Sequence, residues 1–589
     1  SVDGWKSKKK DSVNGLCANV DYKAFLLELV DVTALSKDGP SLARLFGEII
    51  DRVEVRYNCI VIYFGTDADG GSKKGRIILG KERPWLIVPS CWAHQFQLIL
   101  GDYFKVYEIA AVIAEEAVEL IAWINNHARV RKIFDDAQAE ISQDRLSRVV
   151  ILAYLVANLT RWTTHFIAFA RLFLLREALQ LAVLRKRASI VAAQVGAATH
   201  KEADRLREEA SKFCHRVQDQ TFWVGLETVL EDLESICLGT NINQKDSTRL
   251  DQVVLSIGGI YLRFDAHPEA EVRAAMCDRI EKRWKDSDQP VFLLALILNP
   301  FEKLTCFGPN ANLNFLKIRN MLLTTYRRIM SRPSNTDTTE IRADKEKQIL
   351  KALKQYLAGT GDFADFDAVQ WKADYDSEDP VEVWESLELS QEITELARFA
   401  ILILNIVVNQ AGVERAFSRA KIEQSDHRVN LKLDKIDKRI KVKAELRSQH
   451  EKQGLNKRRL GRKNHKSVDH LLTVPRYRDA LEGEENSDTP PDARRLIVGT
   501  VSAWQKEEMD SLDASDEDPD TALPRRLPKF VPITLKTLFG EATKPRQRRI
   551  PDKVREEEER LMEELADAAE DEIPDDGAIE IGSDEEFVG

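Results

Sequence analysis

Two aspartates occupy positions where metal-dependent chemistry would need them. Asp3 lies in the opening stretch SVDGWKSKKKDS, and Asp67 directly follows the apolar run NCIVIYFGT. Carboxylate oxygens are the ligands that Mg²⁺ prefers, and two such ions about 3.5–4 Å apart can hold both the attacking and the leaving oxygen of a phosphodiester. An aspartate after a strand is also a common turn residue, so Asp67 alone does not establish a metal site.

Cys91 and His94 form a second short pattern of chemically active side chains, CWAH. The pattern could be half of a zinc site, but no second Cys/His pair lies at a plausible spacing, and Cys214 and His215 are adjacent. We therefore expect His94 to support the carboxylates from the edge of their site. The seven scattered cysteines indicate a reducing compartment and no disulfide framework.

The elements that must position these groups alternate in type over the first hundred residues. Sequence patterns predict strands or extended segments over residues 1–7, 13–22, 24–35, 58–64 and 85–88. One helix, at 42–53, lies between the third and fourth of these segments. The turn KDGP starts that helix, because proline is favoured in a first helical turn. Three sequential strands suggest a meander, and a helical crossover suggests a parallel fourth strand. This order is ribonuclease-H-like, and it brings the first and fourth strands to one edge of the sheet.

From about residue 98 to 395, apolar residues recur three and four positions apart, which is typical of helices. Polar breaks are expected at 334–339 and 359–367, and a helical block resumes at 389–420. We therefore expect a mixed α+β fold in which a ribonuclease-H-like sheet is split by a large all-helical insertion. The expected divisions are a sheet-bearing part (1–105), a helical insertion (106–385), a carboxy-terminal helix block (386–445), a basic linker (446–478) and an acidic tail (479–589).

Charge is segregated along the chain. Of 86 basic and 97 acidic residues, 14 and 32 fall within residues 479–589, which leaves a net charge of +7 on the residues before them. A basic body with an acidic tail favours nucleic acid as a partner. The run 428–466 contains fifteen Lys and Arg, and it could contact phosphates, act as a nuclear-localisation signal or form a solvated surface. The acidic tail is predicted to be largely disordered.

The apolar content of the chain gives no sign of a membrane partner. The longest apolar candidate, residues 399–408, is about half the roughly 18 residues that a membrane span requires. We interpret it as a buried helix.

The most specific pattern lies at residues 409–421, NQAGVERAFSRAK. This segment resembles the carboxy-terminal block of hAT-family transposases, whose signature ends in E-R-x-F-S after an apolar helix, here 396–408. Residues 426–431 are similar to the R-x-x-L element of that family. The resemblance implies that Glu414 is a third metal-binding carboxylate beside Asp3 and Asp67, which together would hold two Mg²⁺ or Mn²⁺ ions.

Other motifs of the same family occur in the same order, and the resemblance spans roughly residues 1–443 and looks closest to the fungal branch. Cys91 and His94 resemble its C-x-x-H motif, and Arg161-Trp162 resembles an R-W pair that contacts DNA, although a tryptophan in an apolar helix is otherwise a core residue. The predicted DNA contacts are Arg161, Trp162, Lys457, Arg458, Arg459, Arg462 and Lys463. The predicted dimerisation residues are Leu396, Phe399, Ile403 and Phe417.

The resemblance implies a nuclear enzyme of cut-and-paste DNA transposition, acting as a homodimer or a higher oligomer. Transposases of this family carry an amino-terminal zinc-finger module, and nothing similar precedes Asp3, so we expect a fragment that lacks it. Two alternatives remain open. One is a catalytically silent, transposase-derived protein that binds DNA or dimerises, and the other is an unrelated helical scaffold whose acidic tail binds partners.

Overall fold

The computed structural model describes residues 1–453 and 531–540, apart from short gaps. The residues it leaves undescribed within those ranges are 8, 21, 68–69, 147–150, 156–161, 246–247, 376, 378, 389–392 and 425–428, together with the side chains of 145–146, 162–164 and 451. The described residues are mostly helical (70% helix), with a small amino-terminal sheet of three antiparallel strands. None of the helices in the described ranges has both the length and the apolar character needed to cross a membrane.

The three predicted amino-terminal strands form a meander. They are β1 (Val2–Lys6), β2 (Ser12–Val20) and β3 (Lys23–Asp31), in the order β1-β2-β3. Asp3 pairs with Gly15 across β1 and β2, and the register of β2 on β3 shifts at a bulge between Leu16 and Cys17. Successive residues of β1 point to opposite faces, so Val2 and Trp5, three positions apart, enter separate hydrophobic clusters.

The predicted strand at 58–64 is wrong as a regular element. Asn58 adopts a left-handed conformation that ends the preceding helix, and residues 58–60 are exposed. Only isolated parallel bridges form here, between Tyr63 and Ile87 and between Thr66 and Ser90, so residues 85–88 do not form a full strand either. The Val2 N–H nevertheless donates to the Gly65 carbonyl at 3.0 Å. Residues 62–66 therefore lie beside β1, and residues 86–90 lie beside 62–66.

Two helices cover one face of the sheet. The expected helix is α1 (Gly39–Tyr57), which Asp38 caps by accepting from the Ser41 N–H. The second helix, α2 (Gly70–Glu82), was not predicted, because its glycines and lysines disguise its helical period. Gly75 explains how α2 fits, since a Cβ there would lie 3.1 Å from Leu42. The glycine therefore lets the two helices approach closely.

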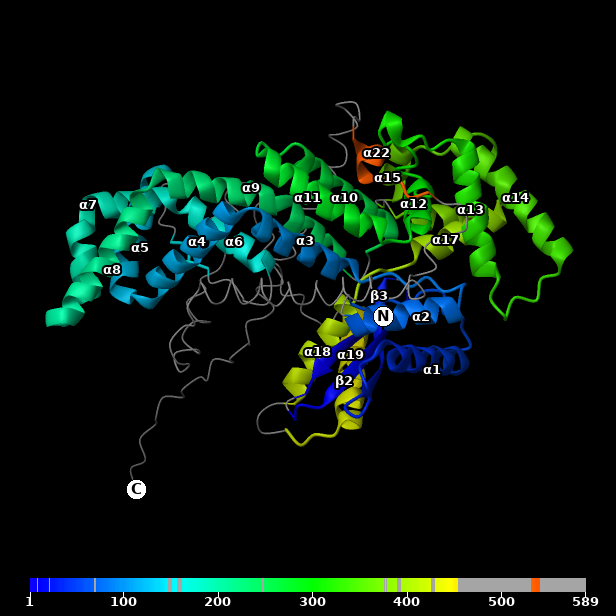
Figure 1. Ribbon diagram of the computed structural model, residues 1–589, viewed down its shortest axis with the longest axis horizontal. Helices are drawn as coiled ribbons and strands as arrows, with labels where there is room; N and C mark the ends of the chain where they lie inside the picture. The colour runs from blue at the N-terminus through cyan, green and yellow to red at the C-terminus, as the bar shows by residue number, and fades with distance from the viewer. Residues whose placement is uncertain are drawn as a thin grey trace, which may run out of the picture.

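The helical body follows, as the apolar periodicity predicts. Figure 1 shows it as an elongated array from α7 and α8 at one end to α14 at the other, with the sheet and its flanking helices beneath. Its helices are α3 (Trp92–Val106), α4 (Glu108–Asn126), α5 (Ala128–Leu146), α6 (Trp162–Leu174), α7 (Arg176–Val195), α8 (His200–Gln218), α9 (Gln220–Asn243), α10 (Leu250–Asp265), α11 (Ala270–Lys285), α12 (Gln289–Ile297), α13 (Phe315–Met330), α14 (Thr339–Ala358), α15 (Ala368–Tyr375), α16 (Pro380–Leu387) and α17 (Thr394–Leu404), with 3₁₀ turns η1 (Pro309–Ala311) and η2 (Gly361–Phe363).

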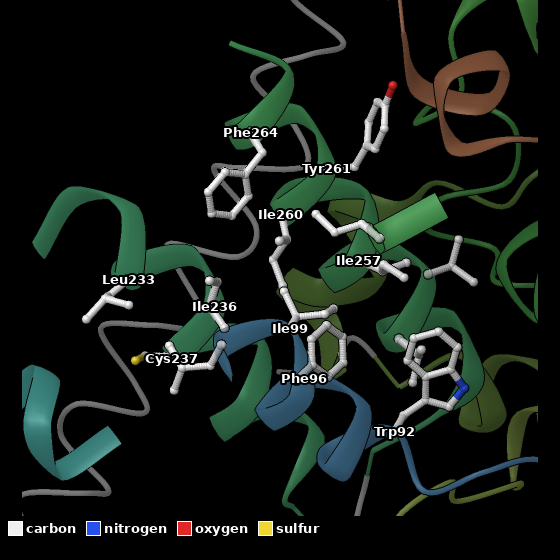
Figure 2. Packing of buried hydrophobic residues seen from close by; sticks show 14 of the residues in the cluster. Trp92, Phe96, Ile99, Leu233, Ile236, Cys237, Ile257, Ile260, Tyr261 and Phe264 are labelled. Carbon is white, nitrogen blue, oxygen red and sulfur yellow. The ribbon is translucent and has the colours of Figure 1, made fainter. Parts of the chain in front are cut away.

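The core of the body lies where α3, α9 and α10 meet. Figure 2 shows Phe96 and Ile99 of α3 packed among side chains of the other two helices, including Ile236 and Ile260. Gly239 of α9 lies against Phe96, where a Cβ would come within 3.3 Å of the ring. The body therefore has one continuous apolar interior, and α3 begins directly beside the sheet.

Two late helices return to the sheet. These are α18 (Ala411–Glu423) and α19 (Leu433–Lys452), which pack on the face opposite α1 and α2 (Figure 1). Two cations of α19, Arg439 and Lys443, pair with the buried Glu423 carboxylate of α18. The chain thus completes its amino-terminal unit with segments some 400 residues away.

One part of the predicted disordered tail is folded against the helical body. Residues 531–540 contain the short helix α22 (Leu535–Phe539), which lies beside α10 and η1. Figure 1 shows it in orange over the green helices. The remainder of the acidic tail lies outside the described residues.

Candidate carboxylate site

Asp3 lies on the sheet face that α18 covers. Alternate residues of a strand share a face, so Asp3 points to the same side as Trp5, whose ring stacks on Phe417 of α18 at 5.8 Å. Its cross-strand partner Gly15 lies under the same helix, because a Cβ there would come within 2.7 Å of Phe417 and 2.9 Å of Val413. The sheet therefore presents Asp3 toward α18.

Glu414 lies in the first turn of α18 and is exposed. Its backbone N–H donates to the Gln410 carbonyl at 3.1 Å, while the Gln410 side-chain amide donates to the carbonyl of Val2. Val2 immediately precedes Asp3. One buried glutamine thus contacts both elements that carry the proposed carboxylates.

Electrostatics place Cys91 in the same neighbourhood. Burial is the largest cause that raises the pKa of the Cys91 thiol, and with the smaller contributions of the Glu414 and Asp3 charges, opposed by hydrogen bonds from the backbone of His94 and Gln410, the pKa reaches about 12. The thiol therefore stays protonated at neutral pH, which disfavours it as a zinc ligand or nucleophile. His94 lies half-buried in the first turn of α3.

Asp67 follows the segment that lies beside β1. Its carbonyl accepts from the Thr66 hydroxyl at 3.0 Å and from the guanidinium of the buried Arg76 at 3.2 Å, and that guanidinium also donates to the Ser90 hydroxyl at 2.9 Å. The Cys91 N–H donates to the Thr66 carbonyl at 2.9 Å. Asp67 thus lies one residue from a direct backbone contact with Cys91.

The connection between α17 and α18 joins the sheet to the helical body. The Val408 carbonyl accepts from the Trp92 N–H at 3.0 Å, where α3 begins. The side chain of buried Asn409 donates to the Lys245 carbonyl and accepts from the Ala411 N–H at 3.1 Å. Together with the hydrogen bond from the Gln410 side chain to the Val2 carbonyl, these contacts tie the start of α18 to α3, to the residues after α9 and to β1. They restrain where Glu414 can lie.

The carboxylates of Asp3, Asp67 and Glu414 are chemically suitable ligands for a divalent ion, but they are not gathered into one ligand group. Carboxylates are hard oxygen donors appropriate to Mg²⁺ or Mn²⁺. Within the described parts of the chain, no group of three or more His, Cys, Asp or Glu side chains is placed to hold a metal ion. The structure thus brings Asp3 and Glu414 to one region beside Cys91 without forming a closed three-ligand cluster.

The predicted DNA contacts lie largely outside the described residues. This holds for Arg161 and for all five basic residues between 457 and 463, namely Lys457, Arg458, Arg459, Arg462 and Lys463. Trp162 begins α6, but its side chain is not described. The role of these residues in DNA binding stays a prediction.

The predicted dimerisation residues fill the interior of the protomer. Leu396, Phe399 and Ile403 are at most 1% exposed, and the Phe399 ring meets Tyr326 at 5.7 Å. Phe417 is 6% exposed beneath Trp5. An interface built by this helix block would therefore have to use other side chains.

Two positioning residues escaped the sequence interpretation. Gln410 stands between an apolar helix and the E-R-x-F-S segment, and the polar pair Asn409-Gln410 at that boundary was the available signal. Arg76 lies in the unpredicted α2, and nothing in its neighbourhood distinguishes it from an ordinary surface arginine. Both act through long-range contacts, which no local pattern encodes.

Comparison with models of known protein families finds no match to this chain. A search of curated proteins likewise finds no matching protein.

Proposed function

We propose that the protein is an hAT-like DNA transposase region whose catalytic carboxylates are Asp3, Asp67 and Glu414. The observation that carries the proposal is the return of α18 to the face of β1 that bears Asp3, with Glu414 in its first turn. Asp3 and Glu414 are more than 400 residues apart in sequence, yet the negative charge of each raises the pKa of the same thiol, that of Cys91. The resemblance to the transposase block had already singled out Glu414.

The arrangement of the chain around β1 supports a ribonuclease-H-like sheet. The order runs β3, β2, β1, then residues 62–66 and 86–90, which contact through the Val2–Gly65 hydrogen bond and two parallel bridges. Such an order places Asp67 after the segment next to Asp3. The antiparallel pairing of β1 with β2 and the parallel bridges between residues 62–66 and 86–90 are both features that the predicted mixed sheet would contain.

The residues of the chain would have distinct roles in phosphodiester cleavage. Divalent ions, when bound, would supply Lewis-acid stabilisation of charge on the attacking and leaving oxygens. Asp3, Asp67 and Glu414 would bind them, and Gln410 would fix the first and third of these carboxylates relative to one another. The neutral Cys91 thiol would add no negative charge to the site. Arg76 would hold the backbone of the loop that carries Asp67.

DNA nicking tests this function directly. The full chain is incubated with supercoiled plasmid in Mg²⁺ or Mn²⁺, alongside Glu414→Gln and a matched control, Glu445→Gln, which changes an exposed glutamate on the neighbouring α19. We expect wild type and the control to nick DNA, and Glu414→Gln to match the protein-free sample. Equal nicking by Glu414→Gln and wild type would rule out the catalytic assignment.

A transposase-derived protein that binds DNA without cutting it is the second candidate. It is favoured by the finding that the described side chains include no three-ligand metal group. Such a protein should retard DNA in a gel equally well with Mg²⁺ and with EDTA, and should show no nicking. A mobility shift that requires the divalent ion would instead favour the enzyme.

A further inference from the structure

Residues 531–540 (VPITLKTLFG) occupy a groove in the helical body, although residues 454–530 separate them from the last described residue before them. Their apolar residues follow helical spacing, so that one side of α22 faces inward. The side chains of Leu535, Leu538 and Phe539 are fully buried, whereas Val531 is 79% exposed and Lys536 faces solvent. A short segment thus inserts three apolar anchors and leaves its polar side in water.

The walls of the groove are shaped to those anchors. The Phe539 ring stacks on Phe307 at 5.8 Å. Beneath it lies Gly258 of α10, where a Cβ would come within 2.7 Å of the ring. This glycine is a notch that a larger residue would close, and the phenylalanine fills it.

Hydrogen bonds to the segment backbone fix its register. The Trp284 indole N–H donates to the Ile533 carbonyl at 2.8 Å, and the Gln289 side chain accepts from the Ile533 N–H at 2.9 Å. The Gly308 N–H donates to the Leu538 carbonyl at 2.7 Å. Both backbone groups of Ile533 are therefore paired by side chains of the body, which is how proteins read an extended stretch of peptide.

A carboxylate caps the helical turn. Glu281 of α11 accepts from the N–H groups of Leu535 and Lys536 at 2.9 and 2.8 Å, the first two residues of α22. A negative charge there is favoured because the first amides of a helix lack internal partners and carry partial positive charge. Burial raises the pKa of Glu281, and these two N–H groups oppose that rise.

The elements that line the groove also pack on one another. Its walls are α10, α11, α12 and the η1 turn; α10 packs on both α11 and α12, and Trp284 of α11 meets Phe292 of α12 at 6.2 Å. The segment adds the three buried side chains of Leu535, Leu538 and Phe539 to walls that the body supplies. It resembles a bound peptide that is covalently attached to the chain.

We propose that this groove is a docking site for a linear peptide motif, and that its occupant is the chain's own segment 531–540, held reversibly so that a free peptide of the same sequence can replace it. The motif is an apolar residue in extended conformation followed by one helical turn with apolar residues at its first, fourth and fifth positions. The inference is independent of the carboxylate site and of DNA cleavage.

Peptide binding to the full chain tests the proposal. A release variant carries Leu538→Asp and Phe539→Asp, and a fluorescent peptide of residues 531–540 is titrated into it and into wild type while its anisotropy is followed. We expect the release variant to bind at least about tenfold more tightly, because its groove is open. Adding Gly258→Leu to the release variant should abolish binding, since the new side chain fills the notch. A peptide carrying the same two aspartates is the matched control and should not bind.

Equal peptide binding by wild type and a folded release variant, or equal binding of the control peptide, would overturn the proposal. A second measurement decides the matter should the release variant fail to fold. A protease site is inserted within residues 454–530 of the wild-type chain, the chain is cut, and excess free peptide is added before gel filtration. We expect the peptide to displace the tail piece. A tail piece that co-elutes unchanged at saturating peptide would show that the segment is a permanent part of the core.

Discussion

Two late segments, α18 and α22, are seated on earlier elements with the same aromatic geometry. Phe417 of α18 stacks on Trp5 of the sheet, and Phe539 of α22 stacks on Phe307 of the helical body. Both ring pairs have centroids 5.8 Å apart and planes inclined by 23°. Stacking of this kind adds to the stabilisation from burying the rings themselves.

A glycine lies beneath each ring. A Cβ at Gly15 would come within 2.7 Å of Phe417, and one at Gly258 would come within 2.7 Å of Phe539. In both places the missing side chain provides the volume that the ring occupies, which explains why these positions require glycine. The packing device is therefore not what distinguishes the two sites.

The difference lies in the polar groups that each segment brings. In α22, groups of the helical body pair with the backbone of the turn: Glu281 accepts from the N–H groups of Leu535 and Lys536. The Lys536 side chain faces solvent. In α18, the exposed Glu414 carboxylate is brought to the face of the sheet that carries another carboxylate, Asp3. The same packing device thus serves two ends. In α22 it buries a turn whose first two N–H groups are paired with Glu281 of the body, whereas in α18 it brings an exposed carboxylate to a sheet face that carries another.

The largest expected effect is on α18. Phe417→Ala should destabilise the protein by about 3–5 kcal/mol, because it removes a buried aromatic ring and leaves a cavity above Gly15. Chemical denaturation followed by circular dichroism measures this change. A loss below about 1 kcal/mol would mean that the sheet collapses onto the cavity, and that α18 is not held by this ring.

Phe539→Ala should have a smaller global effect, although the two rings have the same packing geometry. Its release frees only residues 531–540, so the midpoint of unfolding of the body should shift less than in Phe417→Ala. Hydrogen exchange should show faster exchange at Lys536 and unchanged exchange within α10. Parallel loss of protection in α10 would contradict the view that the groove forms without the segment.

Gln410→Ala should cost about 1–3 kcal/mol, because it leaves the Val2 carbonyl without its buried donor. Gln424→Ala is the matched control, since that buried glutamine also donates to a backbone carbonyl, that of Val429 at 3.1 Å. We expect similar losses of stability in both variants, with weaker Mn²⁺ binding only in Gln410→Ala. Equal weakening of Mn²⁺ binding in Gln410→Ala and Gln424→Ala would show that Gln410 does not position the carboxylates.

The smallest effect is expected for Glu281→Gln. The glutamine can still accept one hydrogen bond from α22 but carries no negative charge, so peptide affinity in the release variant should fall about tenfold or less. Titration of the labelled peptide at constant pH measures the change. A gain in affinity would show that burying the carboxylate costs more than its two hydrogen bonds return.

The sequence predicted the elements whose signals are local. The meander β1–β3, the proline-marked start of α1 and the helical body follow from alternation, a turn with proline at the helix start, and helical spacing. The strand at 58–64 failed because an apolar, β-branched run was taken as buried, whereas Asn58 ends α1 and leaves the next residues exposed. Helix α2 was missed because Gly75, which lowers helical propensity, is present for contact with Leu42.

Long-range contacts explain the rest. Gln410 gains its importance only because residue 2 folds beside it, and residues 531–540 gain theirs only because Gly258 leaves a notch. The ten-residue, largely apolar segment 531–540 inside an acidic tail has no local feature that reveals a groove elsewhere. For the candidate site, Asp3 and Asp67 could be proposed from strand positions, whereas Glu414 could be proposed only through the family resemblance.

Mn²⁺ binding tests the central claim most directly, because it requires neither DNA nor catalysis. Calorimetric titration compares the full-length wild type with Asp3→Asn, Asp67→Asn and Glu414→Gln, with Glu445→Gln as the control. We expect each of the first three changes to weaken Mn²⁺ binding at least about tenfold, and the control to leave it unchanged. Wild-type affinity in all three carboxylate variants, with their fold intact by circular dichroism, would contradict a shared metal site.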